Sequence, residues 1–207
     1  MKLLNLLFLV LAAATASAAE EPLAFKGLAM GATEEEVVKK YPKLSCRGEP
    51  ARRSCFQVWN EKEHSKLLSS CIRDGESPAA CRQKVNEGLE AETVASVPIR
   101  YMLFRFHDNQ LGLISLVTPA AEFGKVASAY LDRYGKPAKD EAWAFAPKGG
   151  KAIQNREFRW LLPAGTIRVT RWSAQVNGSS VMYLSHEGAR AFTEQYSEDR
   201  KKAASDL

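Results

Sequence analysis

The chain has 207 residues, of which 45% are hydrophobic and 26% are charged, and its formal net charge is +5. This length is enough for one good hydrophobic core or two small domains. Lysines and arginines are interspersed with acids and form no basic stripe, so we do not expect a nucleic-acid-binding surface. No segment beyond the N-terminus is apolar enough to span a bilayer, and we expect no membrane span.

Residues 1–18 have the pattern of a cleavable signal peptide. Lys2 gives a positive start, Leu3–Leu11 a short apolar run, and Ala16-Ser17-Ala18 a small-residue cleavage signal. The apolar run is shorter than the about 20 residues that a spanning helix needs. The residue after the expected cut is Ala19 and not cysteine, so no lipid anchor is expected. We therefore predict a periplasmic or secreted protein.

The four cysteines are Cys46, Cys55, Cys71 and Cys81. An even number of cysteines in an exported chain is typical of disulfides. Among the three possible pairings we predict Cys46–Cys55 and Cys71–Cys81, because each pair lies within one local element. A zinc site is the alternative, but its ligands usually come in closer pairs such as C-x2-C. We expect no metal and no other cofactor.

The mature chain opens with a predicted short strand over residues 25–31, followed by a helix over 33–41. Thr33 and Glu36 have the spacing of a capping box at the start of that helix. The cluster Glu34-Glu35-Glu36 is interpreted as its first turn rather than as a cation site.

Two strands joined by a loop are expected around Cys46 and Cys55. Residues 61–91 then become rich in Glu, Lys, Ser and Ala, which favours helices. Asp74-Gly75 and Pro78 mark a turn inside this segment. We predict a helical hairpin inserted between strands and held by the second disulfide.

Residues 98–118 carry the clearest strand pattern, with a two-residue turn at Asp108-Asn109. Both faces are apolar, which is typical of central strands. The turn predicts three cross-strand pairs: Phe106 with Leu111, Phe104 with Leu113, and Leu103 with Ile114.

A second helix is predicted over residues 123–134 because its apolar residues recur at helical spacing. Gly135 and Pro137 end it. Strands are expected at 141–146, 156–162, 166–173 and 180–185, and residues 187–207 predict a charged C-terminal helix or tail.

This order predicts an α+β fold of two strand-helix-antiparallel-sheet units in tandem, with the helices packed on one sheet face and a helical hairpin insertion. The domain would cover residues 19–186. Unit one is 22–107 with the insertion 61–91, and unit two is 111–186. No Gly/Ser/Pro-rich linker separates them, which favours one continuous sheet.

The pattern Phe25-Lys26-Gly27-Leu28-x-x-Gly31-x-Thr33-x-x-x-Val37, followed by Cys46 and Cys55, resembles the repeat unit of secreted β-lactamase inhibitory proteins. It also resembles the small lipoprotein of the outer-membrane β-barrel assembly machine, and exported bacterial proteins of undescribed role share the layout. The resemblance implies a tandem-unit fold. Ala19 replaces the acylated cysteine of the lipoprotein, and the inhibitory proteins have no obvious counterpart of residues 61–91, so no target is carried over.

No H-E-x-x-H, G-x-S-x-G or glycine-rich phosphate loop occurs in the sequence. The histidines are His64, His107 and His186, and only His107, followed by Asp108, offers part of a triad. A turn is the favoured interpretation of that pair. We therefore predict no catalytic residue.

Alternation in residues 156–162 and 166–173 predicts one buried and one open sheet face. We predict that the open face binds a partner through Arg159, Leu161, Arg168, Thr170 and Trp172, since arginine and tryptophan often anchor interfaces. A half-solvated sheet with an incidental tryptophan is the alternative.

The leading hypothesis is a non-catalytic binding protein, an inhibitor or accessory subunit, that docks another envelope or secreted protein. One alternative is a hydrolytic enzyme with a cleft between the two units and His107 as a base. Another is a structural or chaperone-like envelope component that makes its contacts through residues 61–91.

Overall fold

The body of the protein is an eight-stranded antiparallel sheet. The computed structural model describes residues 23–58, 66, 69–81, 92–145, 152–173 and 178–205; the predicted signal peptide lies outside them. In spatial order the strands are β3 (Ser45–Arg47), β4 (Ser54–Val58), β7 (Tyr101–His107), β8 (Gln110–Thr118), β12 (Gly178–Ser185), β11 (Gly165–Ser173), β10 (Ile153–Leu162) and β9 (Lys139–Phe145). The predicted α+β class and the single continuous sheet are confirmed.

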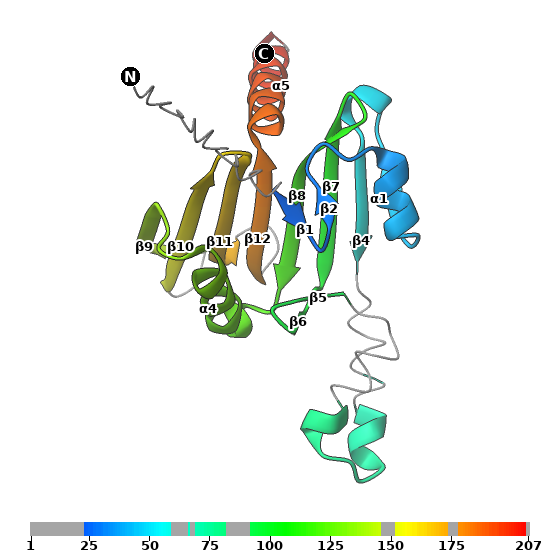
Figure 1. Ribbon diagram of the computed structural model, residues 1–207, viewed down its shortest axis with the longest axis vertical. Coiled ribbons are helices and arrows are strands. Elements are labelled where there is room, and N and C mark those ends of the chain that lie inside the picture. Colours follow the sequence, from blue (N-terminus) through cyan, green and yellow to red (C-terminus); the bar gives the residue numbers. More distant parts are fainter. Residues whose placement is uncertain are drawn as a thin grey trace, which may run out of the picture.

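The helices and short elements are placed around this sheet (Figure 1). They are α1 (Glu34–Lys40), α4 (Phe123–Tyr134), α5 (His186–Ser205), the 3-10 turns η1 (Pro50–Arg52) and η2 (Ala120–Glu122), and the hairpins β1 (Ala24–Phe25) with β2 (Leu28–Ala29) and β5 (Thr93–Val94) with β6 (Val97–Pro98). The expected strand at 25–31 is therefore a tight hairpin. Lys26 and Gly27 form its turn with φ of 48° and 76°.

Helices α1 and α4 pack on the same face of the sheet. Tyr41, at the end of α1, stacks on Phe104 of β7 with ring centroids 5.2 Å apart. On α4, Phe123 stacks on Phe158 of β10 at 6.0 Å. The aromatic rings thus fill the space between each helix and the sheet, and burying side chains of this size contributes about 1.5–3 kcal/mol each.

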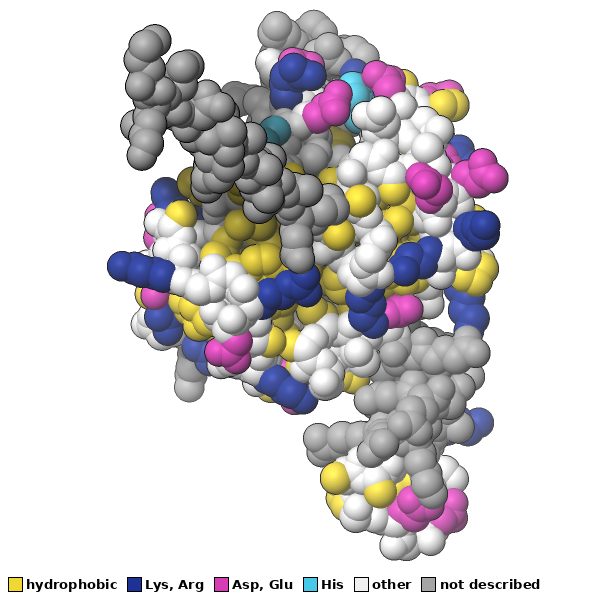
Figure 2. All heavy atoms as spheres, viewed as in Figure 1, with side chains coloured by type: hydrophobic (Ala, Val, Ile, Leu, Met, Phe, Trp, Pro, Cys, Tyr) yellow, Lys and Arg dark blue, Asp and Glu magenta, His cyan; other side chains and the backbone are white. Residues whose placement is uncertain are grey.

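The covered face also carries an aromatic hollow beside α4. It has a volume of about 220 Å³, and Phe25, Tyr130, Tyr134 and Tyr183 line it. Figure 2 shows hydrophobic side chains gathered between α4 and the β1–β2 hairpin, with lysine and arginine around them. The small hairpins therefore complete the layer that α1 and α4 begin.

Helix α5 is placed differently from α1 and α4, so the expectation that the helices share one sheet face is only partly met. It follows β12 directly, and the Ser185 hydroxyl accepts the Gly188 N–H at 2.9 Å to cap it. A Cβ on Gly188 would lie 2.3 Å from the Gly112 carbonyl oxygen, so only glycine permits this contact. Beyond it, the Phe192 ring lies 4.9 Å from the Arg105 guanidinium, on the opposite face.

The β7–β8 hairpin has the predicted turn, but its register corrects two of the three predicted pairs. Asp108 and Asn109 have positive φ, and Phe106 pairs with Leu111 as expected. A bulge follows, so Phe104 pairs with Ile114 instead of Leu113, and Leu103 pairs with Ser115 instead of Ile114. The bulge inserts Gly112 into β8, where α5 packs against it.

The predicted helical hairpin is described only in part. Residues 66, 69–73 and 78–81 are helical, with a turn at Asp74-Gly75 between the last two segments; residues 61–65, 67–68 and 82–91 lie outside the described residues.

Both predicted disulfides are confirmed. Cys46 and Cys55 are cross-strand partners on β3 and β4 with Cα atoms 4.0 Å apart. Cys71 and Cys81 bridge the described helical turns, and their Cα atoms are 5.7 Å apart. Such bridges are typical of proteins that fold in an oxidising compartment.

We predict that the two bridges stabilise different parts of the protein. Cys46→Ser should lower the free energy of unfolding of the sheet by roughly 2.5–3 kcal/mol, because the bridge reduces the conformational entropy of the unfolded chain. Cys71→Ser should leave that transition nearly unchanged. Urea unfolding followed by tryptophan fluorescence measures both. Equal losses in the two variants would show that the bridges stabilise one cooperative unit.

Two buried tyrosines of the core form a polar pair. The hydroxyls of Tyr130 on α4 and Tyr183 on β12 are hydrogen-bonded to each other, and both residues are about 95% buried. Burial raises the pKa of both phenols far above the ordinary value. The two hydroxyls therefore stay protonated and depend on each other for a partner.

A double-mutant cycle tests this pair. Tyr130→Phe or Tyr183→Phe leaves one buried hydroxyl without its partner, and each should lower the free energy of unfolding by about 1–3 kcal/mol. The double variant removes both polar groups and should cost less than the sum of the single changes. Urea denaturation gives all three values, and strictly additive losses would refute the coupling.

Candidate functional site

The strand register identifies the side chains that share the face opposite α1 and α4. Cross-strand partners stand on the same face of a sheet. One row crosses six strands on that side: Arg159 on β10, Arg168 on β11, Met182 on β12, Ser115 on β8, Leu103 on β7 and Phe56 on β4. We call the side that contains this row the open face.

The predicted partner-binding residues differ in how they meet solvent. Leu161 is the most open, with 65% of its surface exposed. Arg159 and Arg168 are partly exposed, whereas Thr170 is only 9% exposed. Trp172 is partly exposed, and its indole N–H is buried without a hydrogen-bond partner among the described residues. Register places the first four on the open face.

The two predicted arginines share one buried carboxylate that sequence reasoning missed. Oε1 of Glu157 accepts a hydrogen bond from Arg159 at 2.5 Å and lies 3.4 Å from Nε of Arg168. Oε2 accepts the Thr170 hydroxyl at 3.2 Å. The Glu157 side chain is 10% exposed. The sequence could have suggested Glu157, because it lies two residues before Arg159 on β10 and therefore on the same face. Its contact with Thr170 could be predicted only from the register of β10 with β11.

Trp143 on β9 is a second residue that the sequence argument did not select. It is 40% exposed, and its cross-strand partner is Asn155 of β10. The Asn155 side-chain amide bonds both the N–H and the carbonyl of Trp172. Alternation along β9 puts Trp143 on the open face with Glu141, the partner of Glu157.

Glu157→Gln tests whether this carboxylate organises the open face. The amide keeps the shape but removes the charge that two arginines share, so we expect the free energy of unfolding to fall by about 1.5–3 kcal/mol. The matched control is Glu141→Gln, whose side chain is 51% exposed and should change stability by less than about 0.5 kcal/mol. Thermal unfolding of both variants measures the difference. Equal effects would contradict the special role of Glu157.

A hollow of about 440 Å³ lies at the other end of the open face, over β3, β4 and β7. Its lining comprises Arg47, Gly48, Arg52, Ser54, Phe56, Tyr101, Leu103 and Arg105. Three of these residues are arginines and none is acidic. The sequence did not predict this hollow, because residues 61–91 separate β4 from β7 in the chain. We call it the arginine hollow.

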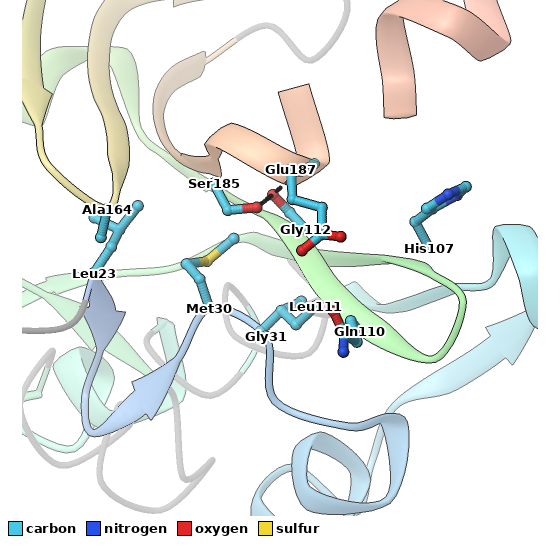
Figure 3. Close-up of a pocket in the computed structure, with 11 residues that line it drawn as sticks. Leu23, Met30, Gly31, His107, Gln110, Leu111, Gly112, Ala164, Ser185 and Glu187 are labelled. Atoms are coloured by element: carbon cyan, nitrogen blue, oxygen red, sulfur yellow. Dashed lines mark hydrogen bonds between the residues drawn. The ribbon is translucent and has the colours of Figure 1, made fainter. Parts of the chain in front are cut away.

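The alternative hypothesis of an enzyme with His107 as a base concerns a pocket at the start of α5. A pocket of about 170 Å³ is lined there by His107, Ser185 and Glu187, among others. Figure 3 shows the His107 imidazole turned away from Ser185. Nε2 of His107 lies 3.4 Å from the Asp108 carboxylate, and the Ser185 hydroxyl bonds the backbone of Gly188 and Gly112. These described residues do not form a nucleophile–base pair.

The remaining candidate groups have structural partners. His186 Nε2 lies 3.0 Å from the Pro163 carbonyl oxygen, and His64 falls outside the described residues. Glu34 is near Cys46 and Cys55, but those sulfurs form a disulfide, and its carboxylate pairs with Arg53 at 3.1 Å.

The acidic cluster at 34–36 is the predicted capped turn of α1. Glu36 completes the capping box with Thr33. Two hydrogen bonds to its carboxylate hold the pKa of Glu36 below its ordinary value. The larger effect comes from the Thr33 backbone N–H and the smaller from the Thr33 hydroxyl.

Comparison with models of protein families, with curated proteins and with solved structures finds no match to this chain. Within the described ranges, no helix combines the length and the apolar character needed to cross a membrane.

Proposed function

We propose that the chain is an exported, non-catalytic binding protein that docks another envelope or secreted protein through the open face. The observation that carries this proposal is the unequal covering of the sheet. On one side α1, α4 and the small hairpins bury the strands. On the other, α5 contacts Gly112 of β8 and Arg105 of β7, but Leu161 of β10 is 65% and Trp143 of β9 is 40% exposed, beside partly exposed arginines. Aromatic residues and arginine are enriched in the cores of protein interfaces.

The element order supports the same proposal. Helix α1 is followed by β3, β4, β7 and β8, and α4 is followed by β9 to β12; each set of four is contiguous in the sheet. We propose that these are two tandem units that meet at the β8–β12 pair, with the boundary after β8, whereas the sequence pattern had assigned residues 111–118 to unit two. The arrangement resembles that expected from the Phe25–Val37 pattern of secreted inhibitory proteins. An inhibitor or accessory subunit is the concrete form of the function.

Export is part of the proposal. The N-terminal pattern of residues 1–18 and the two disulfides support it together, since disulfides persist in oxidising compartments. Cleavage after Ala18 would leave a periplasmic or secreted protein without a lipid anchor.

Site-specific photo-crosslinking tests the docking face. We expect benzoylphenylalanine at position 161 of the disulfide-intact mature protein to form a discrete covalent adduct with a protein from an envelope fraction of the source cells. The matched control is the same group at Asp132, an exposed residue on α4. It should give no such adduct, because that helix covers the other side of the sheet. Adducts at both positions, or at neither, would contradict docking through the open face.

Two outcomes would favour the alternatives. Turnover in a hydrolase panel that is lost in a folded His107→Ala variant would support the enzyme. Loss of the adduct on deleting residues 61–91, with the sheet intact by circular dichroism, would support a chaperone-like component that binds through the insertion.

A further inference from the structure

We propose that the arginine hollow binds an acidic, extended segment of the partner protein, with a carboxylate held between Arg47 and Arg105. This inference rests on the proposed function and adds the chemistry of the partner's contact.

The two arginines stand in one row of the open face. Ser54 of β4 is the cross-strand partner of Arg47 on one side and of Arg105 on the other. Neighbouring strands lie about 4.8 Å apart, so the Cα atoms of the two arginines are roughly 10 Å apart. Arginine side chains reach several ångströms from the backbone. A carboxylate in the hollow would lie between these two arginine side chains, which line it together with Ser54.

Aromatic rings hold both guanidinium groups. That of Arg47 lies over the Phe56 ring at 4.7 Å, and that of Arg105 lies over Phe192 of α5 at 4.9 Å. A stacked guanidinium keeps its N–H edges free in the ring plane, where they match a carboxylate. Because stacking already restricts these side chains, less conformational entropy is lost when they bind.

The two arginine pairs of the open face differ in whether the protein itself supplies a carboxylate to them. Arg159 and Arg168 share the buried Glu157. Within the described chain, no carboxylate pairs with Arg47 or Arg105, and no acidic residue lines the hollow. One pair is partly balanced by a carboxylate of the protein itself, whereas no described carboxylate balances the other, whose charge is left for a ligand.

The wall of the hollow is fixed in place before any ligand binds. The Cys46–Cys55 bridge joins the two strands on one side. The loop after β3 is tied to β7 by hydrogen bonds from the Phe106 N–H to the Arg53 carbonyl at 2.8 Å and from the Asp108 N–H to the Ala51 carbonyl at 3.4 Å. A preformed site binds with a smaller ordering cost.

The apolar floor favours a peptide segment over a free anion. Phe56 and its cross-strand partner Leu103 form the next row, and both are partly exposed. Rows on one face are two residues apart along a strand, about 6.6–6.8 Å, which is also the spacing of alternate side chains in an extended peptide. A segment with acid and apolar residues at i and i+2 would place the acid beside Ser54 and the apolar side chain beside Leu103, because the Arg47 guanidinium already lies over the Phe56 ring. An inorganic anion would leave that floor in water.

Fluorescence anisotropy with defined peptides tests the site. The probe is a fluorescein-labelled peptide of repeated Glu-Ser-Phe-Ser, and its control has Gln in place of Glu. We expect the disulfide-intact protein to bind the Glu peptide more tightly, and Arg47→Glu or Arg105→Glu to weaken that binding by about tenfold or more. Arg47→Gln and Arg105→Gln, which avoid charge reversal, should weaken it less. Arg171→Glu is the matched control, because Arg171 is exposed and does not line the hollow.

Three results would overturn the inference. The Gln peptide binding equally well would exclude carboxylate recognition. Equal losses in Arg47→Glu and Arg171→Glu would show general charge attraction. Displacement of the peptide by millimolar phosphate at constant ionic strength would identify a free-anion site instead.

The crosslinking experiment separates this inference from the proposed function. If the adduct at position 161 persists undiminished in Arg47→Glu and Arg105→Glu, the hollow is not the contact and docking through the open face stands. If no adduct forms at position 161 in the parent protein, the proposed function itself fails, whatever the peptides do.

Discussion

The antiparallel pairing of β8 with β12 is the constraint on which the rest of this structure depends. It joins the first four strands of the sheet to the last four. A slip of one residue there would move the side chains of one half to the opposite face. Close backbone contacts oppose such a slip: a Cβ on Gly178 would lie 2.6 Å from the Thr118 carbonyl oxygen. The arginine hollow and the Glu157 network share one face because this register is fixed.

Local sequence rules predict the elements whose determinants lie close together in the chain. Asp108-Asn109 specifies its own turn, Thr33 and Glu36 cap their own helix, and each disulfide closes a separation of nine or ten residues. Such rules do not predict the bulge at Gly112, which lies against Gly188, a residue far along the chain. The register beyond that bulge therefore could not be read from the turn alone.

The same distinction applies to the candidate site. Alternation along β10 and β11 was enough to place Arg159 and Leu161 on one face. The arginine hollow needs Arg47, Ser54 and Arg105 in one row, and that row forms only when β4 pairs with β7 across the segment 61–91. No local pattern marks those three residues, because each is an ordinary polar position within its own strand.

The edges of the sheet favour recognition by side chains of the open face over addition of a strand from the partner. Exposed edges invite pairing unless they are short or charged. At one end β3 has only three residues, and its Cys46 is bridged to β4. At the other, β9 carries Asp140, which bonds Arg156 through both carboxylate oxygens at 2.7–2.8 Å. With both edges protected in this way, the open face is the part of the sheet best suited to a partner. Under the proposed function, charge on that face selects the partner, because Glu157 partly balances Arg159 and Arg168, whereas no described carboxylate pairs with Arg47 or Arg105.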